Sequence, residues 1–337
     1  HRHPPGPSQQ RERPVSALKQ LACAVGTVGG VGVATLGWSL IEARWPVLRR
    51  IEVPVLAPGS APIKLLHIAD LHLTGATKAR VAWVRALADI EPDLVINTGD
   101  NLSTLGGVSA LGEALEPLLA FPGAFVLGDH DRHGTVFRSP TRYLRRDPRS
   151  NDDPVADLPV LPWEEVRDMQ LAGGWKDLDN CRDTVEAAGQ LIELVGVADA
   201  HADDDAFPEP VAAGESAAGG SSAAVVKIGV THAPYQRVLD QMVTDGAQLI
   251  LAGHTHGGQL CLPGYGALVS NCDLPPAQAS GLSTWPASFK AIHKGTAPAS
   301  EDGQAYLHVS AGLGTSPFTP VRTACRPEAT LLTLTAR

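Results

Sequence analysis

The sequence predicts an α/β domain whose strands are buried on both faces. Six short apolar runs separated by polar stretches are typical of buried strands. They lie within residues 63–70, 93–100, 124–131, 190–199, 225–234 and 247–256. Between the first two runs, an expected helix over 77–92 carries an apolar stripe of Val81, Val84, Leu87 and Ala88. Strand, helix and strand in this order indicate a sheet that needs helices or a second sheet on both faces.

The composition fits one large catalytic domain. The chain has 337 residues, of which 44% are hydrophobic and 19% charged. This content excludes disorder of the whole chain. A net charge of −9 argues against a protein that grips nucleic acid through a basic surface, so no nucleic-acid partner is expected. The five cysteines are too scattered for a disulfide scaffold, and whether Cys261 pairs with Cys272 stays open.

An uncharged apolar run covers residues 21–41. As a helix it would be about 31 Å long at ~1.5 Å per residue, which matches the hydrocarbon core of a bilayer. We therefore expect a basic tail over 1–20, a single-pass transmembrane helix over 21–41, and a short β-like approach and linker over 42–62. A signal peptide and a buried core helix are the alternatives. Basic residues flank the run on both sides, so they decide the orientation poorly, and the extracytoplasmic side is slightly favoured.

The catalytic domain is expected over residues 63–337. Residues 202–223 interrupt it with a stretch that is poor in large hydrophobic side chains, and this stretch is expected to be a disordered surface insertion. Nothing in the sequence indicates the oligomeric state.

Histidine and aspartate gather where the expected strands end. Ligands of open α/β sheets bind beyond the carboxyl ends of the strands. The clusters are Asp70-Leu71-His72, Gly99-Asp100-Asn101, Gly128-Asp129-His130-Asp131, Thr231-His232 and Gly253-His254-Thr255-His256-Gly257. Imidazole together with carboxylate suits divalent Mn, Fe, Zn or Co, whereas magnesium and calcium prefer oxygen ligands. The clusters therefore predict a metal site at the strand ends.

This order of motifs resembles the calcineurin-like metallophosphoesterases, whose pattern runs D-x-H, GD, GNH[DE], a single His and GHxH. The resemblance covers residues 63–337. Within the family, the chain looks most similar to a bacterial membrane-associated branch. This branch includes transmembrane proteins with a metallophosphoesterase domain and envelope phosphodiesterases similar to UDP-2,3-diacylglucosamine pyrophosphatase. The apolar N-terminal run carries that narrower match together with Gly99–Asn101, Gly253–Gln259 and Ser310–Glu328.

The resemblance implies a four-layer α/β/β/α sandwich that holds two divalent metal ions. The ligands of the first ion would be Asp70, His72 and His256. Those of the second would be Asp129, His232 and His254, with Asp100 bridging both ions. A hydroxide between the ions would attack the phosphorus. His130 would bind phosphate or protonate the leaving oxygen, and Asp131 would orient the His130 imidazole.

The implied reaction is hydrolysis of a phosphodiester or pyrophosphate bond, in a phosphorylated small molecule or a lipid-linked envelope substrate. Asp129 replaces the asparagine of the family pattern and lowers the charge of the site by one. Arg132 and Arg138 could restore positive potential beside the substrate, and Asp199 is a further expected substrate contact. Two alternatives stay open, namely a weakly active or non-catalytic metal-bound binding module and a soluble exported nucleotide phosphodiesterase.

Overall fold

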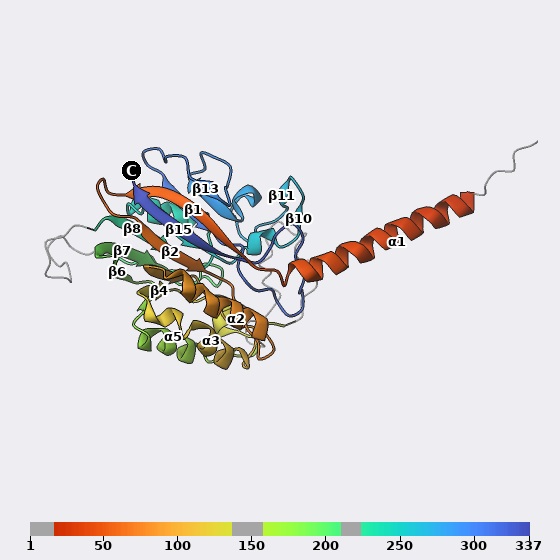
Figure 1. Ribbon diagram of the computed structural model, residues 1–337, viewed down its shortest axis with the longest axis horizontal. Coiled ribbons are helices and arrows are strands. Elements are labelled where there is room, and N and C mark those ends of the chain that lie inside the picture. Colours follow the sequence, from red (N-terminus) through yellow and green to blue (C-terminus); the bar gives the residue numbers. More distant parts are fainter. Residues whose placement is uncertain (1–16, 137–157, 210–223) are drawn as a thin grey trace, which may run out of the picture.

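Two mixed β-sheets form the centre of the domain in the computed structural model, which describes residues 17–136, 158–209 and 224–337 (Figure 1). The first sheet has, in spatial order, β13 (Gly295–Thr296), β1 (Val47–Leu56), β15 (Glu328–Ala336), β2 (Ile63–Ile68), β3 (Leu94–Asn97), β4 (Gly123–Phe125) and β5 (Lys176–Asp177). The second has β12 (Gly281–Trp285), β14 (Ala305–Val309), β9 (Leu249–Ala252), β8 (Val226–Val230), β7 (Gln190–Gly196) and β6 (Arg182–Ala187). All six predicted strands are present. A short hairpin, β10 (Cys261–Leu262) with β11 (Gly266–Ala267), lies outside both sheets.

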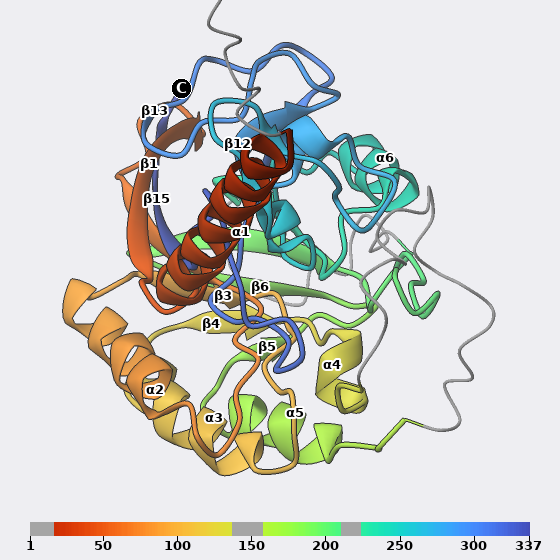
Figure 2. The ribbon, with the colours of Figure 1, turned by 90° about the vertical axis from the view of Figure 1, so that its right-hand side faces the viewer.

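Helices cover the outer face of each sheet. They are α2 (Lys78–Arg85), α3 (Gly107–Leu115), α5 (Trp163–Ala172) and α6 (Gln236–Thr244). The short helix α4 (Asp129–Arg132) follows β4, and 3₁₀ turns lie at Ala86–Ile90, Leu118–Ala120, His256–Gly258 and Pro276–Gln278. One apolar core packs α2, α3 and α5 on the first sheet, and another packs α6 on the second. A third core fills the space between the sheets with side chains such as Leu65, Ile228 and Leu332. The layers therefore run helices, sheet, sheet, helix (Figure 2).

Parallel pairing places several strand ends at one edge of the molecule. In the first sheet β2, β3, β4 and β5 pair in parallel, and in the second β7, β8, β9 and β14 do the same. The carboxyl ends of β2, β3, β4, β8 and β9 carry the five histidine and aspartate clusters that the sequence analysis identified. The mixed α/β class predicted from the sequence is confirmed, and the cluster-bearing loops meet between the two sheets.

The expected linker over 42–62 is wrong for most of its length. Strand β1 lies inside the first sheet, where it pairs in parallel with β15 over nearly its whole length and with β13 at Ile51 and Glu52. Its residues Val53 and Val55 are fully buried in the core between the sheets. This segment therefore belongs to the domain.

The expected disordered insertion is wrong for its first part. Residues 202–209 are held against the domain, because the Arg182 guanidinium donates to the main-chain oxygens of Pro208 and Glu209 and lies 5.4 Å from the Phe207 ring centroid. Residues 210–223 lie outside the described part of the chain.

Helix α1 (Ala17–Glu42) projects from the domain and covers the apolar run at 21–41 (Figure 1). Within the described residues, no helix has both the length and the apolar character needed to cross a bilayer. The expected transmembrane helix is therefore unsupported by the structure.

Candidate active site

The backbone turns sharply at the strand ends that carry the predicted metal ligands. Five of these residues have positive φ, a conformation that costs energy for any residue with a Cβ. They are Asp70 (50°), His72 (42°), Asp100 (55°), His254 (67°) and His256 (50°). In the D-x-H and H-x-H motifs, two such residues flank one ordinary residue. Strain of this kind gathered at one edge of a fold is typical of a functional site.

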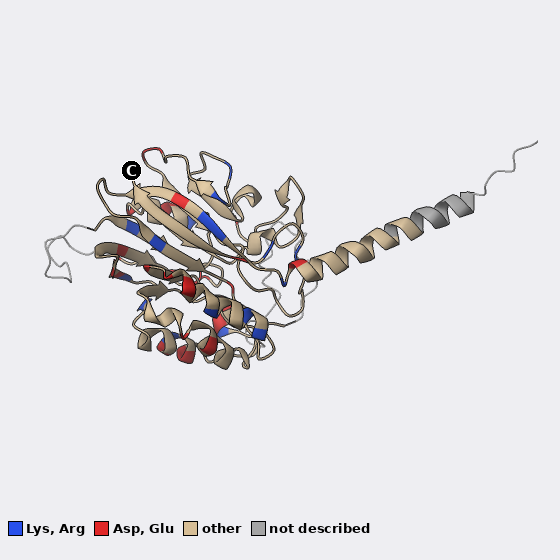
Figure 3. Ribbon diagram, viewed as in Figure 1, with Lys and Arg blue, Asp and Glu red and all other residues tan. Residues whose placement is uncertain are grey.

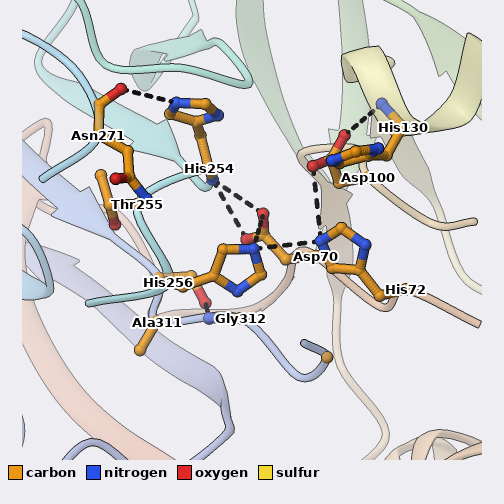
Figure 4. A network of polar contacts seen from close by, with 12 residues as sticks. Asp70, His72, Asp100, His130, His254, Thr255, His256, Asn271, Ala311 and Gly312 are labelled. Atoms are coloured by element: carbon orange, nitrogen blue, oxygen red, sulfur yellow. Dashed lines mark hydrogen bonds and ion pairs between the residues drawn. The ribbon is translucent and has the colours of Figure 1, made fainter. Parts of the chain in front are cut away.

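One group of ligand atoms comes from Asp70, His72 and His256, whose carboxylate and imidazole atoms lie within 4.8 Å of one another. The two Nε2 atoms of His72 and His256 are 3.1 Å apart, and His256 Nε2 is 3.9 Å from Asp70 Oδ1 (Figure 4). Ser103 Oγ contacts His72 Nδ1 at 3.1 Å and so fixes the ring with Nε2 toward the group. This is the set predicted for the first metal ion.

A second group joins Asp70 and Asp100 to His232, again with ligand atoms within 4.8 Å. Asp100 Oδ2 lies 3.6 Å from His72 Nε2 and 3.4 Å from His232 Nε2. The Asp100 carboxylate thus sits between a histidine of each group, where a bridging ligand would be needed. The structure also places Asp70 in both groups, which the sequence did not indicate.

The donor set fits divalent metal ions. His232 Nδ1 donates to the main-chain oxygen of Thr98 at 2.7 Å, so the neutral ring presents a lone pair at Nε2. That Nε2 atom is buried and has no hydrogen-bond partner among the described residues. Gly128 leaves the room beside it, because a Cβ there would collide with the Asp100 carboxylate and come 2.8 Å from His232 Cε1. Buried carboxylates and imidazoles around such a space are ligands typical of Mn, Fe, Zn or Co.

Burial governs the protonation of most of these side chains. It raises the pKa of Asp70 to about 7 and lowers the pKa of His254 to about 4. Asp100 and His232 behave differently. Burial disfavours the charged form of both groups, but neighbouring charges outweigh it. The His232 and His130 rings hold the pKa of Asp100 well below its usual range. The Asp100 and Asp199 carboxylates raise the pKa of His232 well above the usual value for histidine. In the chain without metal, a proton on His232 therefore offsets Asp100, and a divalent cation would compete with it.

Asp129, His130 and His254 line the same pocket as these groups, whose cavity volume is about 140 Å³. The His130 main chain donates to Asp100 Oδ1 at 2.9 Å, and its ring centroid is 5.1 Å from that of His72. His254 Nε2 donates to the main-chain oxygen of Asn271 at 3.2 Å (Figure 4). Asp129 Oδ1 lies 2.8 Å from His133 Nδ1. Neither Asp129 nor His254 belongs to the two three-residue groups, so their ligand roles stay predictions.

The prediction that Asp131 orients the His130 imidazole is wrong. The fully buried Asp131 carboxylate accepts from the main-chain nitrogens of Asn101 (2.8 Å) and Gly128 (3.1 Å) and from Asn101 Nδ2 (3.2 Å). The His130 ring instead has its Nδ1 atom 3.4 Å from the main-chain oxygen of His133. Asp131 therefore fixes the loops that carry Asp100 and Asp129, and it does not orient the His130 imidazole.

Two of the three expected substrate contacts, Arg132 and Asp199, do not line the pocket. Arg132 pairs with Asp179 at 3.3 Å and lies over the Trp163 ring at 4.7 Å. The buried Asp199 carboxylate accepts from the main-chain nitrogens of Asp129 and His201, both at 2.9 Å, so it supports the loops behind the pocket. Arg138 lies outside the described residues.

Sequence reasoning missed three residues of this region. His133 contacts Asp129 one helical turn away, a spacing of four that could have been noticed. Asn271 lines the pocket beside His254, and Arg322 lies against His256. Asn271 lies outside every motif of the sequence analysis. Arg322 lies within Ser310–Glu328, which was matched to the narrower branch, but no role was predicted for the arginine itself.

Comparison with known proteins agrees with this geometry. A family model described as calcineurin-like phosphoesterase matches residues 63–258. The chain belongs to the calcineurin-like phosphoesterase family. It is a hydrolase that acts on phosphoesters, and its family uses divalent metals.

The similarity to known proteins extends beyond residues 63–258. Phosphodiesterase YaeI of Escherichia coli (strain K12) is 24% identical over 323 residues, which are 94% of this chain and 97% of that protein. Solved structures similar to this chain include a 5′-nucleotidase precursor from Thermus thermophilus, with 16% identity, a TM-score of 0.40 and coverage of 81% of this chain and 55% of that one. Phosphopantetheinyl hydrolase from Mycobacterium tuberculosis aligns with 12% identity, a TM-score of 0.37 and coverage of 80% and 96%.

Proposed function

We propose that this protein hydrolyses phosphodiester or pyrophosphate bonds with two divalent metal ions at the strand-end pocket. Asp70, His72 and His256 would hold one ion, and Asp129, His232 and His254 the other, with Asp100 between them. The observation that carries the proposal is the pair of overlapping ligand groups at the strand ends. All of their members except His232 have positive φ, and all except Asp70 line the pocket.

The bound ions would supply Lewis acidity and activate water at neutral pH. The chain's own residues hold the metal ligands in place and supply a proton. Asp131 and Asp199 fix the loops that carry Asp100 and Asp129, and the buried walls keep the ligand geometry constant through the reaction. His130 stands at the pocket beside His72, where it would donate a proton to the leaving oxygen.

The test starts from the full chain stripped of metal and reloaded with Mn²⁺, Zn²⁺ or Co²⁺. Activity is measured on a bis-aryl phosphodiester, a phosphomonoester and a nucleotide pyrophosphate. We expect metal-dependent cleavage with a preference for the diester or the pyrophosphate. Tight metal binding without turnover on any of them would instead identify a binding module.

A lipid-linked or envelope substrate is the finer part of this proposal. The pocket of about 140 Å³ is smaller than sites that enclose a whole drug-sized ligand, so it suits a phosphoryl group with the remainder outside. Val136, Leu158 and Phe318 line the same pocket and offer apolar surface to such a remainder. Faster cleavage of a diester with an acyl chain than of its short-chain analogue supports this substrate class, and equal rates count against it.

We likewise propose that α1 attaches the protein to a membrane, with the domain on the extracytoplasmic side. Val31, Val33, Leu36 and Ile41 are each more than half exposed, and the sequence of the helix has no charged residue between Lys19 and Glu42 (Figure 3). Co-sedimentation of the full chain with phospholipid vesicles tests this. We expect binding that is lost in the double variant Val33→Glu/Leu36→Glu, and a chain that stays in the supernatant would refute the attachment.

A further inference from the structure

Arg322 is a fully buried arginine that lies directly behind the first group of metal ligands. Its Nη2 atom donates to the main-chain oxygens of Ala311 and Gly314, both at 2.7 Å. Within the described part of the chain, no carboxylate lies within ion-pair distance of it, and its Nε atom has no partner. A buried cation without an acid beside it is costly, so a role in the site is a reasonable explanation for it.

The guanidinium holds His256 from the side opposite the ligand group. Nη2 is 3.2 Å from His256 Nδ1, and Nη1 is 3.4 Å from the main-chain oxygen of His256. Nη2 has two hydrogens and three acceptors, so one hydrogen is shared between a carbonyl oxygen and Nδ1, and the guanidinium donates to the ring from this side. With its Nδ1 edge blocked, the His256 ring turns Nε2 toward Asp70 and His72.

The same side chain also braces Asp70. The turn at 311–314, which Arg322 ties down, lies against the aspartate, since the nitrogen of Gly314 donates to the Asp70 main-chain oxygen and that of Leu313 to Ala69. A Cβ at Gly312 would lie 2.5 Å from Asp70 Cβ, which shows how closely the turn packs. One arginine thus fixes the surroundings of two of the three ligands in the group.

We propose that Arg322 is a positioning residue of the metal centre, which presets His256 and Asp70 for a divalent cation. This inference rests on the proposed function. The planar fork suits the role, because several carbonyls and a ring are held at once, which the single ammonium of lysine does not reproduce.

The base of α1 holds Arg322 in turn. The Arg322 main-chain nitrogen donates to the oxygen of Ser39 at 3.0 Å, and Ser39 Oγ lies 2.6 Å from Thr323 Oγ1. Glu42 Oε1 accepts from the nitrogen of Cys325 at 2.8 Å. The segment that positions His256 is therefore anchored on the helix that projects from the domain.

The test compares Arg322→Lys and Arg322→Met with wild type. Binding of Mn²⁺ and Zn²⁺ to the metal-stripped full chain is measured by calorimetry, together with metal content, thermal unfolding, and kcat as a function of metal concentration. Loss of a residue that orients a metal ligand typically weakens metal binding roughly 10- to 100-fold. We expect that loss in both variants, including the one that keeps the charge, with kcat largely restored at saturating metal.

Arg182→Met is the matched control. Arg182 is half-buried and forms a two-pronged pair with Asp245 at 2.7 and 2.8 Å, but it contacts no candidate ligand. It should lower stability without changing metal affinity. If an Arg322 variant fails to fold, Ser39→Ala removes one hydrogen bond beside it and should weaken metal binding a few-fold in the same direction.

Unchanged or tighter metal binding in folded Arg322 variants would overturn the positioning role and leave the proposed function intact. Wild-type protein that binds neither metal would overturn the proposed function itself.

Discussion

Removing the Asp131 carboxylate should destabilise the domain strongly, although the side chain touches no candidate metal ligand. In Asp131→Ala, three buried donors lose their acceptor: the main-chain nitrogens of Asn101 and Gly128, and Asn101 Nδ2. At roughly 1–2 kcal/mol for each donor left unsatisfied, the variant should lose about 3–6 kcal/mol of unfolding free energy. Asp131→Asn keeps one acceptor oxygen and should lose about half as much.

The assay is urea unfolding of both variants at pH 8. Burial and the Asp100 charge raise the pKa of Asp131 only to about 6, so the wild-type carboxylate is ionised there. Asp168→Ala is the control, because this exposed aspartate pairs only with its neighbour Arg167 and should change stability by less than about 0.5 kcal/mol. A loss below about 1 kcal/mol in Asp131→Ala would refute the hydrogen-bond reasoning.

Three further outcomes follow from the site. Asp129→Asn should retain metal less firmly against a chelator but show a lower KM at saturating Mn²⁺, since one negative charge leaves the pocket; firmer metal retention would mean that Asp129 is not a ligand. His130→Ala should lose more activity on an alkyl than on an aryl phosphodiester at unchanged metal content, because only the alkoxide needs a proton; equal losses would exclude proton donation. Burial raises the pKa of Asp179 to about 7, so the folded state binds the extra proton and wild-type stability falls as pH rises from about 4 to 7. Urea unfolding across that window should show Asp179→Asn gaining up to about 1.4 kcal/mol per pH unit relative to wild type, and parallel curves would contradict this.

The strand ends could be predicted because their signal is local. An apolar run followed by Asp-x-His or His-x-His contains both the buried strand and the polar turn within a short stretch of sequence, and the structure places Asp70, His72 and His256 together as expected. The place of strand β1 inside the first sheet was not predicted, for the opposite reason. Its arginines and Pro54 resemble a linker, and its partner β15 lies at the other end of the chain.

Residue adjacency misled the interpretation of Asp131. In the short helix α4 it occupies the third helical position, so its carboxylate turns back to the main chain of Gly128 as in a capping box. The spacing of Gly128 and Asp131 was visible in the sequence, but its neighbour His130 drew the prediction instead. Arg322 lies within Ser310–Glu328, which the sequence analysis singled out, but its role was not predictable because only the fold brings it to His256.

The most direct test of the metal centre is the metal content of the Asp100→Asn variant. Asp100 lies between His72 and His232, so replacing its shared oxygen should empty the centre while the buried core stays folded. Elemental analysis of the full chain should find two divalent ions per wild-type chain, and less than one per Asp100→Asn chain with nearly all diester hydrolysis lost. His293→Ala, away from the motifs, is the control and should keep both ions. Two ions retained in Asp100→Asn would contradict the assignment.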